Sequence, residues 1–380
     1  MFLDKMTSND FLPGNLRLAR TFKGFTLAQL GSIIGVTRQY INQLEQGTRK
    51  PNKETIGALA DALGTTESFF SNPTYSDNTS VYSHHFRRLK KTKLSTIEQV
   101  IAHGVFFRRL VSFLEQEIKF PEVDIPQMEA DTLLQAEIAA KKCRQYWGLT
   151  ADQPISNVAR VVESAGGVIV GFPGLNGDID ALSVDWARPL IVRSSFKASI
   201  TRFRWDIGHE LGHAVLHRDI QTGDEHTESI ANRFAAAFLL PESSFRKHFP
   251  KKRGKLEISS LFAMKKDWKV SVQAMLYRAL ELSLINRAEY KSSMVYLSKR
   301  GFKKLEPFEP DHEEKGEVLA DALAHLEAHR GLTIQDLSKE LDVSEQIIRT
   351  LCGIEPKNSG ENVVHFPNSN TLSRMFEAVG

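Results

Sequence analysis

Residues Arg204 to His217 read R-W-D-I-G-H-E-L-G-H-A-V-L-H, and this stretch organises the rest of the chain. His209 and His213 are four residues apart, so on a helix of 3.6 residues per turn both imidazoles project from one face and can reach one ion. Glu210 stands beside the first histidine. Metal-assisted hydrolysis needs neutral imidazoles that hold Zn²⁺ and a carboxylate beside a metal-bound water. The spacing therefore predicts a zinc-binding helix with Glu210 as general base.

The same pattern also arises on an amphipathic helix with two surface histidines, so the surrounding residues decide between the two interpretations. An apolar face that would bury the helix is formed by Ile207, Leu211, Ala214, Val215 and Leu216. Gly212 would let a neighbouring segment pack closely against the helix. These residues favour a buried, metal-binding helix.

A third metal ligand is expected from Glu228, which opens the helical run E-S-I-A-N-R-F-A-A-A-F-L-L-P. The apolar residues of this run that would pack on the first helix are Ala231, Phe234, Ala235 and Phe238. His217, His226 and Asp224 compete for the same role. Because His217 lies one turn past His213, it reaches the metal only if the helix bends, and we favour a supporting or packing role for it.

H-E-L-G-H followed by E-S-I-A-N-R-F-A-A-A-F-L-L-P resembles the ImmA/IrrE metallopeptidase domain over roughly residues 130–310. The resemblance implies a zincin-like endopeptidase fold with Zn²⁺ held by His209, His213 and Glu228, and with Glu210 as general base. A degenerate domain that serves only as a sensor is the alternative.

Composition places few limits on function. Lys and Arg number 49 against 46 Asp and Glu, so any basic surface must be local. Cys143 and Cys352 lie far apart without metal-like spacing and are expected to be free thiols in a reducing compartment. No signal segment or apolar run of membrane-spanning length occurs in the sequence. We therefore expect a cytoplasmic protein without a membrane partner.

The first segment, residues 15–71, has helical periodicity with short breaks and predicts four or five short helices. Thr26 would cap one helix, Gly35 would end it and Thr37 would cap the next, which is a helix-turn-helix layout. The expected core residues are Leu30, Ile33, Ile41, Leu44, Ile56, Leu59 and Leu63. The segment resembles the XRE/Cro family, including E-Q-G-T-R-K-P after the second helix.

In such a domain the second helix enters the major groove of duplex DNA. The residues expected to read base edges are Arg38, Gln39 and Gln43, with Asn42 less certain. Arg49 and Lys50 would hold phosphates. The alternative is a helical domain for protein contacts only, which the polar and basic exposed positions disfavour.

Residues 72–83 are polar and turn-rich and predict a linker, followed by a basic run at Arg87, Arg88, Lys90, Lys91 and Lys93. Residues 96–119 show a helical apolar stripe wider than one face needs, which we interpret as a bridging or dimerising helix. Three apolar segments after residue 166 predict a small sheet. The expected fold class is α+β, mostly helical, with an all-α helix-turn-helix domain, a zincin-like domain containing a three-stranded sheet, and a C-terminal helical domain.

Residues 332–353 align without gaps on residues 25–46, so the C-terminal segment is expected to be a degenerate repeat of the first one. Leu337 matches Leu30 and Ile348 matches Ile41, but Glu345 stands where Arg38 stands. An acidic residue facing phosphate is unfavourable, so we favour a protein-contacting or regulatory copy.

The predicted division is residues 1–71 for DNA binding, 72–129 for the linker and bridging helix, 130–310 for the peptidase domain and 311–380 for the C-terminal domain. The hypothesis is a homodimeric regulator that binds a double-stranded operator and cleaves a repressor-like protein, or its own linker, after stress or phage challenge. Self-cleavage would give an N-terminal fragment of roughly 75 to 95 residues. The alternatives are a transcription factor with a non-cleaving sensor domain and an antitoxin-like binding module.

Overall fold

The computed structural model describes residues 11–354 apart from 76–93, 152, 173–180, 185–187, 195–198, 219, 221, 253–254, 304–305 and 310–313. The chain forms two compact units. The first contains residues 1–121, 170–175 and 317–380, and the second contains residues 122–169 and 176–316. In sequence, both segments of the second unit therefore lie between residues 121 and 317 of the first. The boundaries that we expect after residues 71, 129 and 310 stay a prediction.

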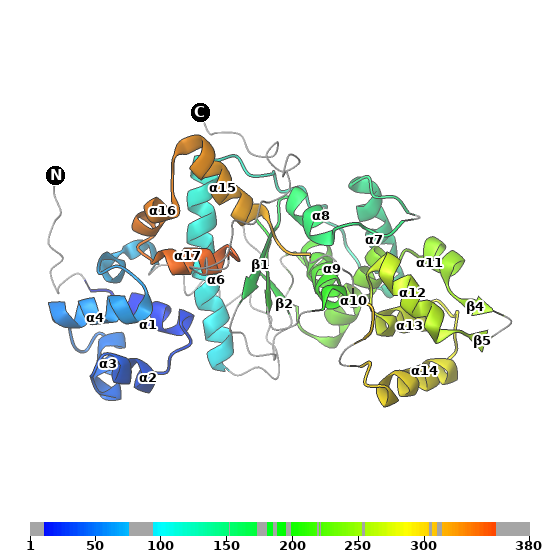
Figure 1. Cartoon of the computed structure of the whole chain (residues 1–380), viewed down its shortest axis with the longest axis horizontal. Coiled ribbons are helices and arrows are strands. Elements are labelled where there is room, and N and C mark those ends of the chain that lie inside the picture. The colour runs from blue at the N-terminus through cyan, green and yellow to red at the C-terminus, as the bar shows by residue number, and fades with distance from the viewer. Residues whose placement is uncertain are drawn as a thin grey trace. The chain divides into compact units, whose positions relative to one another are not determined.

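The first unit begins with four α-helices and two 3₁₀ turns (Figure 1). These are α1 (Pro13–Phe22), α2 (Leu27–Ile33), α3 (Arg38–Glu45), α4 (Lys53–Leu63), η1 (Ser68–Ser71) and η2 (Pro73–Tyr75). As the sequence predicts, the Thr26 side chain caps α2 and the Thr37 side chain caps α3. Gly35 turns the chain between them at φ +73°. Local capping and a left-handed glycine thus set the helix-turn-helix.

The predicted core of these helices is confirmed except at Ile33. Leu30, Ile41 and Leu44 are fully buried, and Ile56, Leu59 and Leu63 are buried. The assignment of Ile33 to the core is wrong, because this residue is 53% exposed. It ends a helix of only seven residues, and α2 buries only Leu30 and Gly31.

The long helix α6 (Leu94–Glu117) provides the centre of the first unit. The Phe106 ring lies 4.5 Å from Phe22, 5.7 Å from Phe69 and 5.5 Å from Tyr75, measured between ring centroids. The C-terminal helices α15 (Val318–Arg330) and α17 (Glu345–Leu351) also contact α6, and α16 (Ile334–Glu340) packs on α17. The chain itself therefore buries the wide apolar stripe that we interpreted as a dimerising surface.

The small sheet predicted after residue 166 is present. Its strands β1 (Val168–Phe172), β2 (Ala181–Val184) and β3 (Leu190–Ser194) have the order β1-β3-β2, and β2 runs antiparallel to β3 with Ala181 opposite Arg193. Helices α7 (Leu133–Tyr146) and α8 (Val158–Ser164) precede the sheet in the chain. A mostly helical chain with one small sheet of this kind confirms the predicted α+β class.

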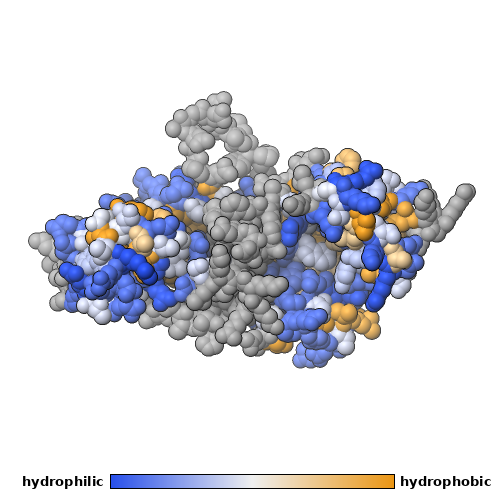
Figure 2. All heavy atoms as spheres, turned by 90° about the horizontal axis from the view of Figure 1, so that it is seen from below, coloured by the Kyte–Doolittle hydropathy of each residue, from blue (hydrophilic) through white to orange (hydrophobic). Residues whose placement is uncertain are grey.

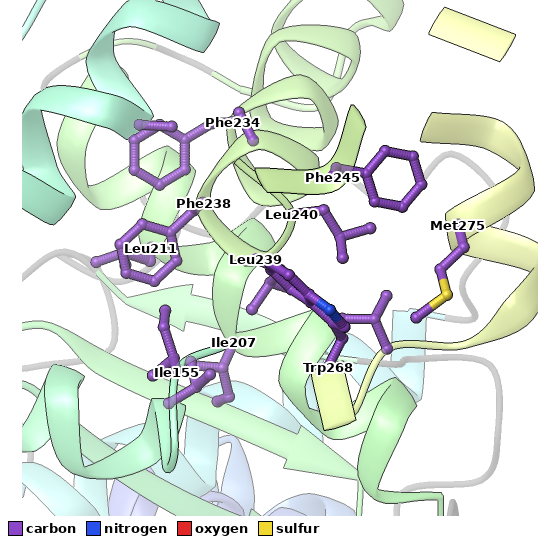
Figure 3. Packing of buried hydrophobic residues seen from close by; sticks show 14 of the residues in the cluster. Ile155, Ile207, Leu211, Phe234, Phe238, Leu239, Leu240, Phe245, Trp268 and Met275 are labelled. Carbon is purple, nitrogen blue, oxygen red and sulfur yellow. The ribbon is translucent and has the colours of Figure 1, made fainter. Parts of the chain in front are cut away.

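Helices α9 (Ile200–Leu216) and α10 (Glu225–Leu239) follow the sheet and pack on one another, and α10 also packs on α7. The remaining elements are α11 (Glu242–His248), β4 (Lys251–Lys252), β5 (Lys255–Leu256), α12 (Ile258–Trp268), α13 (Val272–Glu281) and α14 (Arg287–Lys299). Leu211 from α9 and Phe234 and Phe238 from α10 lie in one hydrophobic core (Figure 3). The metal-binding helix predicted from the sequence is thus at the centre of the second unit.

Buried ion pairs tie α10 to its neighbours. The fully buried Arg278 guanidinium on α13 pairs with the Glu137 carboxylate on α7 and donates to the Leu240 carbonyl at 3.1 Å. Arg233 on α10 pairs with Glu137 at 3.5 Å and with Glu281 at 3.3 Å. Burial raises the pKa of Glu281, and the two arginines oppose that rise. Because these charges are buried and paired, they fix α10 relative to α7 and α13.

Hydrophilic residues predominate on the face seen in Figure 2, where hydrophobic residues form small patches. None of the helices in the described part of the chain is long and apolar enough for a membrane span. The two cysteines, Cys143 and Cys352, are buried and unpaired with each other, as the sequence predicts.

Candidate metal centre and DNA-binding surface

Gly212 lets α10 approach α9 closely. A Cβ atom at this position would lie 3.2 Å from the Ala231 carbonyl oxygen and 3.2 Å from the Phe234 ring. Such contacts are tighter than side chains normally make, so a larger residue would push the helices apart. The predicted close packing at Gly212 is therefore confirmed, and it brings the first turn of α10 near the histidines of α9.

His209, His213 and Glu228 come together at this crossing. The His209 and His213 Nε2 atoms are 3.2 Å apart, and the Glu228 carboxylate oxygens lie 3.5 Å from each of them. Ligand atoms of a tetrahedral zinc ion, bonded at about 2.0 to 2.1 Å, are separated by about 3.3 Å. Among the described residues this is the one group of three or more potential metal ligands. The donor set and its spacing fit Zn²⁺.

Two polar side chains orient the histidine rings. The Asn232 Oδ1 atom lies 3.0 Å from His209 Nδ1, and a carbonyl oxygen only accepts. His209 Nδ1 therefore carries the proton, and the Nε2 lone pair faces Glu228. The His213 Nδ1 atom lies 2.9 Å from Nδ1 of the buried His217. Such partners fix the tautomer of a ligating histidine.

The sequence did not assign Asn232 a role. Asn232 stands four residues after Glu228 on α10, so both side chains lie on one helix face. That spacing is the signal that could have found it. His217, which competes for the metal in the sequence, contacts the far nitrogen of His213 instead and has the supporting position that we favoured.

The other two competing ligands lie elsewhere. Asp224 caps α10, because its carboxylate accepts from the Thr227 hydroxyl at 2.7 Å and from the His226 and Thr227 amides. The Thr227 hydroxyl is the main cause that lowers the pKa of Asp224 to about 2. The His226 side chain is exposed. Neither residue belongs to the cluster of His209, His213 and Glu228.

Glu210 is buried on α9, next to the first histidine. Among the described residues of the second unit, the buried acidic side chains are Glu163, Asp206, Glu210, Glu306 and Glu314. A carboxylate beside the histidines of a metal centre is suited to take a proton from a bound water.

Both ends of α9 are held by segments close to the limits of the second unit. Near its start, the buried Arg204 guanidinium pairs with Glu314 and donates to the Ile155 carbonyl at 2.7 Å. At its end, the Gln127 side chain donates to the Ala214 carbonyl at 3.0 Å, and the Met128 amide donates to the Val215 carbonyl at 3.0 Å. The second unit begins at residue 122 and ends at residue 316. Segments close to its first and last residues therefore hold the helix that carries the histidines.

The predicted DNA-reading residues form one exposed stretch on α3 and the turn after it. Arg38, Gln39 and Asn42 are exposed and Gln43 is half-buried. Arg49 and Lys50 are exposed, and the Arg49 guanidinium lies 4.7 Å from the centre of the Tyr40 ring. The arrangement places polar and basic groups where a groove-binding helix needs them.

An ion pair that the sequence did not reveal sets the position of α3. Arg20 on α1 binds both oxygens of Glu45, at 2.5 and 2.9 Å, and donates to the Phe25 carbonyl at 2.7 Å. This bidentate pair is largely buried. It neutralises the one acidic residue of α3, so the charge presented by that helix is positive. The basic run at residues 87–93 lies outside the described residues.

Comparison with known families assigns both regions. Residues 16–70 match the helix-turn-helix family, and residues 162–280 match the IrrE N-terminal-like domain of the M78 peptidases. No curated protein matches the chain significantly. The chain therefore combines an XRE-type helix-turn-helix with an IrrE/ImmA-like peptidase-family domain, as the two resemblances implied.

Proposed function

We propose that the chain is a DNA-binding transcriptional regulator with a zinc-dependent endopeptidase domain. The observation that carries the peptidase assignment is the convergence of His209, His213 and Glu228 at separations of 3.2 to 3.5 Å. The exposed residues of α3 carry the DNA-binding assignment. A regulator of this kind works in the cytoplasm, where the DNA is.

Each residue of the centre has a defined task in this proposal. A Zn²⁺ ion held at this site would act as a Lewis acid and would lower the pKa of a bound water molecule to about 7. His209, His213 and Glu228 hold the ion, while Asn232 and His217 keep the two imidazoles neutral and oriented. Glu210 takes the proton of the attacking water and returns it to the amine that leaves when the peptide bond breaks.

Metal analysis of matched variants tests the ligand set. We expect about one zinc per wild-type chain, and His213→Ala or Glu228→Ala should lose most of it because one of three protein ligands is gone. His226→Ala is the control, since this exposed residue also lies in the first turn of α10 but outside the cluster. Full zinc in both ligand variants would rule out the assignment, whereas loss in His226→Ala would point to a different site.

Glu210→Gln separates metal binding from hydrolysis. This variant should keep its zinc and lose cleavage, because a glutamine side chain cannot accept the proton of the attacking water. The substrate class we propose is a repressor-like protein or the chain's own linker. Mass spectrometry of the chain from cells under DNA damage or phage challenge distinguishes the two: an intact chain with altered transcription excludes self-cleavage, and a fragment that persists in Glu210→Gln indicates a host protease.

The operator is proposed to be a palindrome bound by a homodimer. Recognition helices of two copies would then contact half-sites about 10 base pairs apart or a multiple of that. Footprinting and sedimentation of the DNA complex test this proposal. A single protected half-site with one chain bound would contradict the dimer.

A second candidate function is a metal-dependent sensor that does not cleave. It is favoured by the Arg204–Glu314 and Gln127–Ala214 contacts at the two ends of α9. A change at the metal centre could pass through these contacts to the segments near residues 122 and 316, where the chain continues into the DNA-binding unit. If zinc removal changes DNA affinity while Glu210→Gln does not, the sensor is the better description. An antitoxin-like module would instead be indicated by a co-purifying toxin.

A further inference from the structure

The C-terminal helices repeat the N-terminal helix-turn-helix element by element. Adding 307, the difference between residues 332 and 25, to the bounds of α2 (Leu27–Ile33) gives those of α16 (Ile334–Glu340). The same shift carries Arg38 to Glu345, and these residues begin α3 and α17. The repeat expected from the sequence is thus present in the backbone.

The buried positions and the cap of the first helix match in the two copies, whereas Ser344 makes no capping hydrogen bond where Thr37 caps α3. Leu30 and Leu337 are both fully buried, as are Ile41 and Ile348. Thr26 forms a capping box at the start of α2, and Thr333 forms one at the start of α16. Matching geometry at these positions means that the second copy is a complete helix-turn-helix rather than a chance similarity of periodicity.

The start of the second helix differs between the two copies, although Gln346 is exposed in the place of Gln39. Glu345 replaces Arg38, and its carboxylate lies 3.8 Å from Arg349 on the same helix. Ile347, in the place of Tyr40, is buried. An acidic residue at the start of this helix is unfavourable beside phosphate, so the second copy is less suited to DNA than the first.

Instead, the turn of the second copy docks on the first copy. The Thr66 amide donates to the Asp342 carbonyl at 3.0 Å, and the Ser344 amide donates to the Gly64 carbonyl at 2.8 Å. The Asp342 carboxylate accepts from Thr66 Oγ1 at 2.9 Å, Ser68 Oγ at 2.5 Å and Asn72 Nδ2 at 2.8 Å.

Tyr75 also takes part in the contact between the two copies. Its hydroxyl donates to the Leu341 carbonyl, and burial is the main cause that raises the Tyr75 pKa. The contact therefore includes a buried hydrogen bond. Breaking it would leave buried polar groups unpaired, which is costly.

Asp342 stands at a position of the turn that favours glycine. The equivalent residue in the first copy is Gly35, at φ +73°, where glycine is unstrained. Asp342 adopts φ +54°, in the left-handed region that glycine enters more readily than residues with a side chain. In place of a glycine, the second copy therefore has the Asp342 carboxylate at the point where it contacts Thr66, Ser68 and Asn72.

We propose that the C-terminal helix-turn-helix is a protein-binding copy whose partner is the N-terminal one, and that it is an integral part of the DNA-binding unit. It contacts residues 64–75 and leaves the exposed stretch at Arg38 to Lys50 uncovered. It therefore stabilises the N-terminal copy without covering the residues that we propose bind DNA. Hydrolysis between residues 76 and 93 would consequently leave the N-terminal copy held by α6 and by this contact.

Hydrogen exchange on the full chain tests the docking. Asp342→Ala should accelerate exchange of the Thr66 and Ser344 amides together by roughly ten- to hundredfold, since hydrogen bonds to a charged acceptor are lost. Asp342→Gly introduces the residue that this turn favours but also lacks the carboxylate, so it should accelerate the same amides. Asp342→Asn keeps one acceptor oxygen and should have a smaller effect than either.

Asp336→Ala is the matched control. Asp336 lies in the same copy and closes the capping box of α16, but it makes no contact with the N-terminal copy in the described residues. It should loosen α16 without changing exchange at Thr66. Unchanged exchange at Thr66 in Asp342→Ala and Asp342→Gly, or equal acceleration in Asp336→Ala, would overturn the proposal.

The second readout is DNA affinity, which rests on the proposed DNA-binding function. The probe is a duplex selected from a randomised pool by the wild-type chain. Asp342→Ala should bind this duplex more weakly, because only chains in which the second copy stabilises the N-terminal copy are able to bind DNA. Equal or tighter binding, with accelerated exchange, would show that the copy is dispensable or inhibitory and would overturn its role in DNA binding. If the wild-type chain selects no duplex, the proposed function fails while the exchange result still judges the docking.

Discussion

The two helix-turn-helix copies share a backbone and differ in their surfaces. Helices α2 and α16 have the same length, and both begin with a threonine capping box. Both copies expose a glutamine, Gln39 and Gln346, but Glu345 stands in the second copy where the first exposes Arg38, and the second buries Ile347. The two copies thus share a first cap and buried apolar positions, and they differ at the start of the helix that we propose binds DNA in the first copy.

The largest expected effect tests whether the two cores are equivalent. Leu30→Ala and Leu337→Ala each remove a fully buried side chain at matching positions. Each should lower the free energy of unfolding by about 2 to 5 kcal/mol, through lost apolar burial and the cavity left behind. Urea unfolding of the full chain, followed by hydrogen exchange to locate the loss, measures both. A cost below about 1 kcal/mol at Leu337 would mean that the second copy is loosely packed.

The pH dependence of the first unit tests the packing of α6. Burial is the main cause that lowers the pKa of His103 to about 3, and its ring lies against Phe22 at 4.1 Å between centroids. Unfolded histidine has a pKa near 6.5, so between about pH 6.5 and 3 the unfolded chain binds the extra proton. Stability should therefore fall as pH falls, by at most about 1.4 kcal/mol per pH unit from this group.

His103→Leu should remove this contribution, because leucine does not titrate. Unfolding of wild type and variant at about pH 7, 6 and 5 gives the comparison. Identical slopes in the two proteins would contradict the buried, neutral state of His103.

The smallest expected effect compares the two caps. Thr26→Ala and Thr333→Ala each remove a hydroxyl that accepts from the third residue of its helix, at 3.2 and 3.3 Å. Each should cost about 1 kcal/mol of unfolding free energy. Thermal unfolding measures both variants, and a loss at only one of them would show that the copies are not equivalent at this position.

The local features of the molecule were predictable from the sequence. Thr26 and Thr37 cap helices as expected, because capping depends on a few consecutive residues. The grouping of His209, His213 and Glu228 followed from helical spacing and from the family resemblance. The assignment of Ile33 to the core was wrong, because periodicity alone does not say where a short helix leaves the core.

Long-range contacts were not predictable. Thr66 and Asp342 are 276 residues apart, and no periodic pattern connects them. The covering of α6 by the C-terminal helices is of the same kind, which is why its apolar stripe resembled a dimer surface. Glu314, the partner of Arg204, lies 110 residues from it in the sequence. Such pairs depend on how the whole chain folds rather than on neighbouring residues.

The most direct test of the central claim, that one copy reads DNA and the other does not, is a DNA titration of Arg38→Ala beside Glu345→Ala. Both change a charged residue at the first position of equivalent helices. Arg38→Ala should relax specificity at one base pair and weaken binding by roughly 1 to 3 kcal/mol, and Lys50→Ala should weaken all sequences alike. Glu345→Ala should leave affinity and footprint as in wild type. Unchanged binding in Arg38→Ala, or a shifted footprint in Glu345→Ala, would contradict the account.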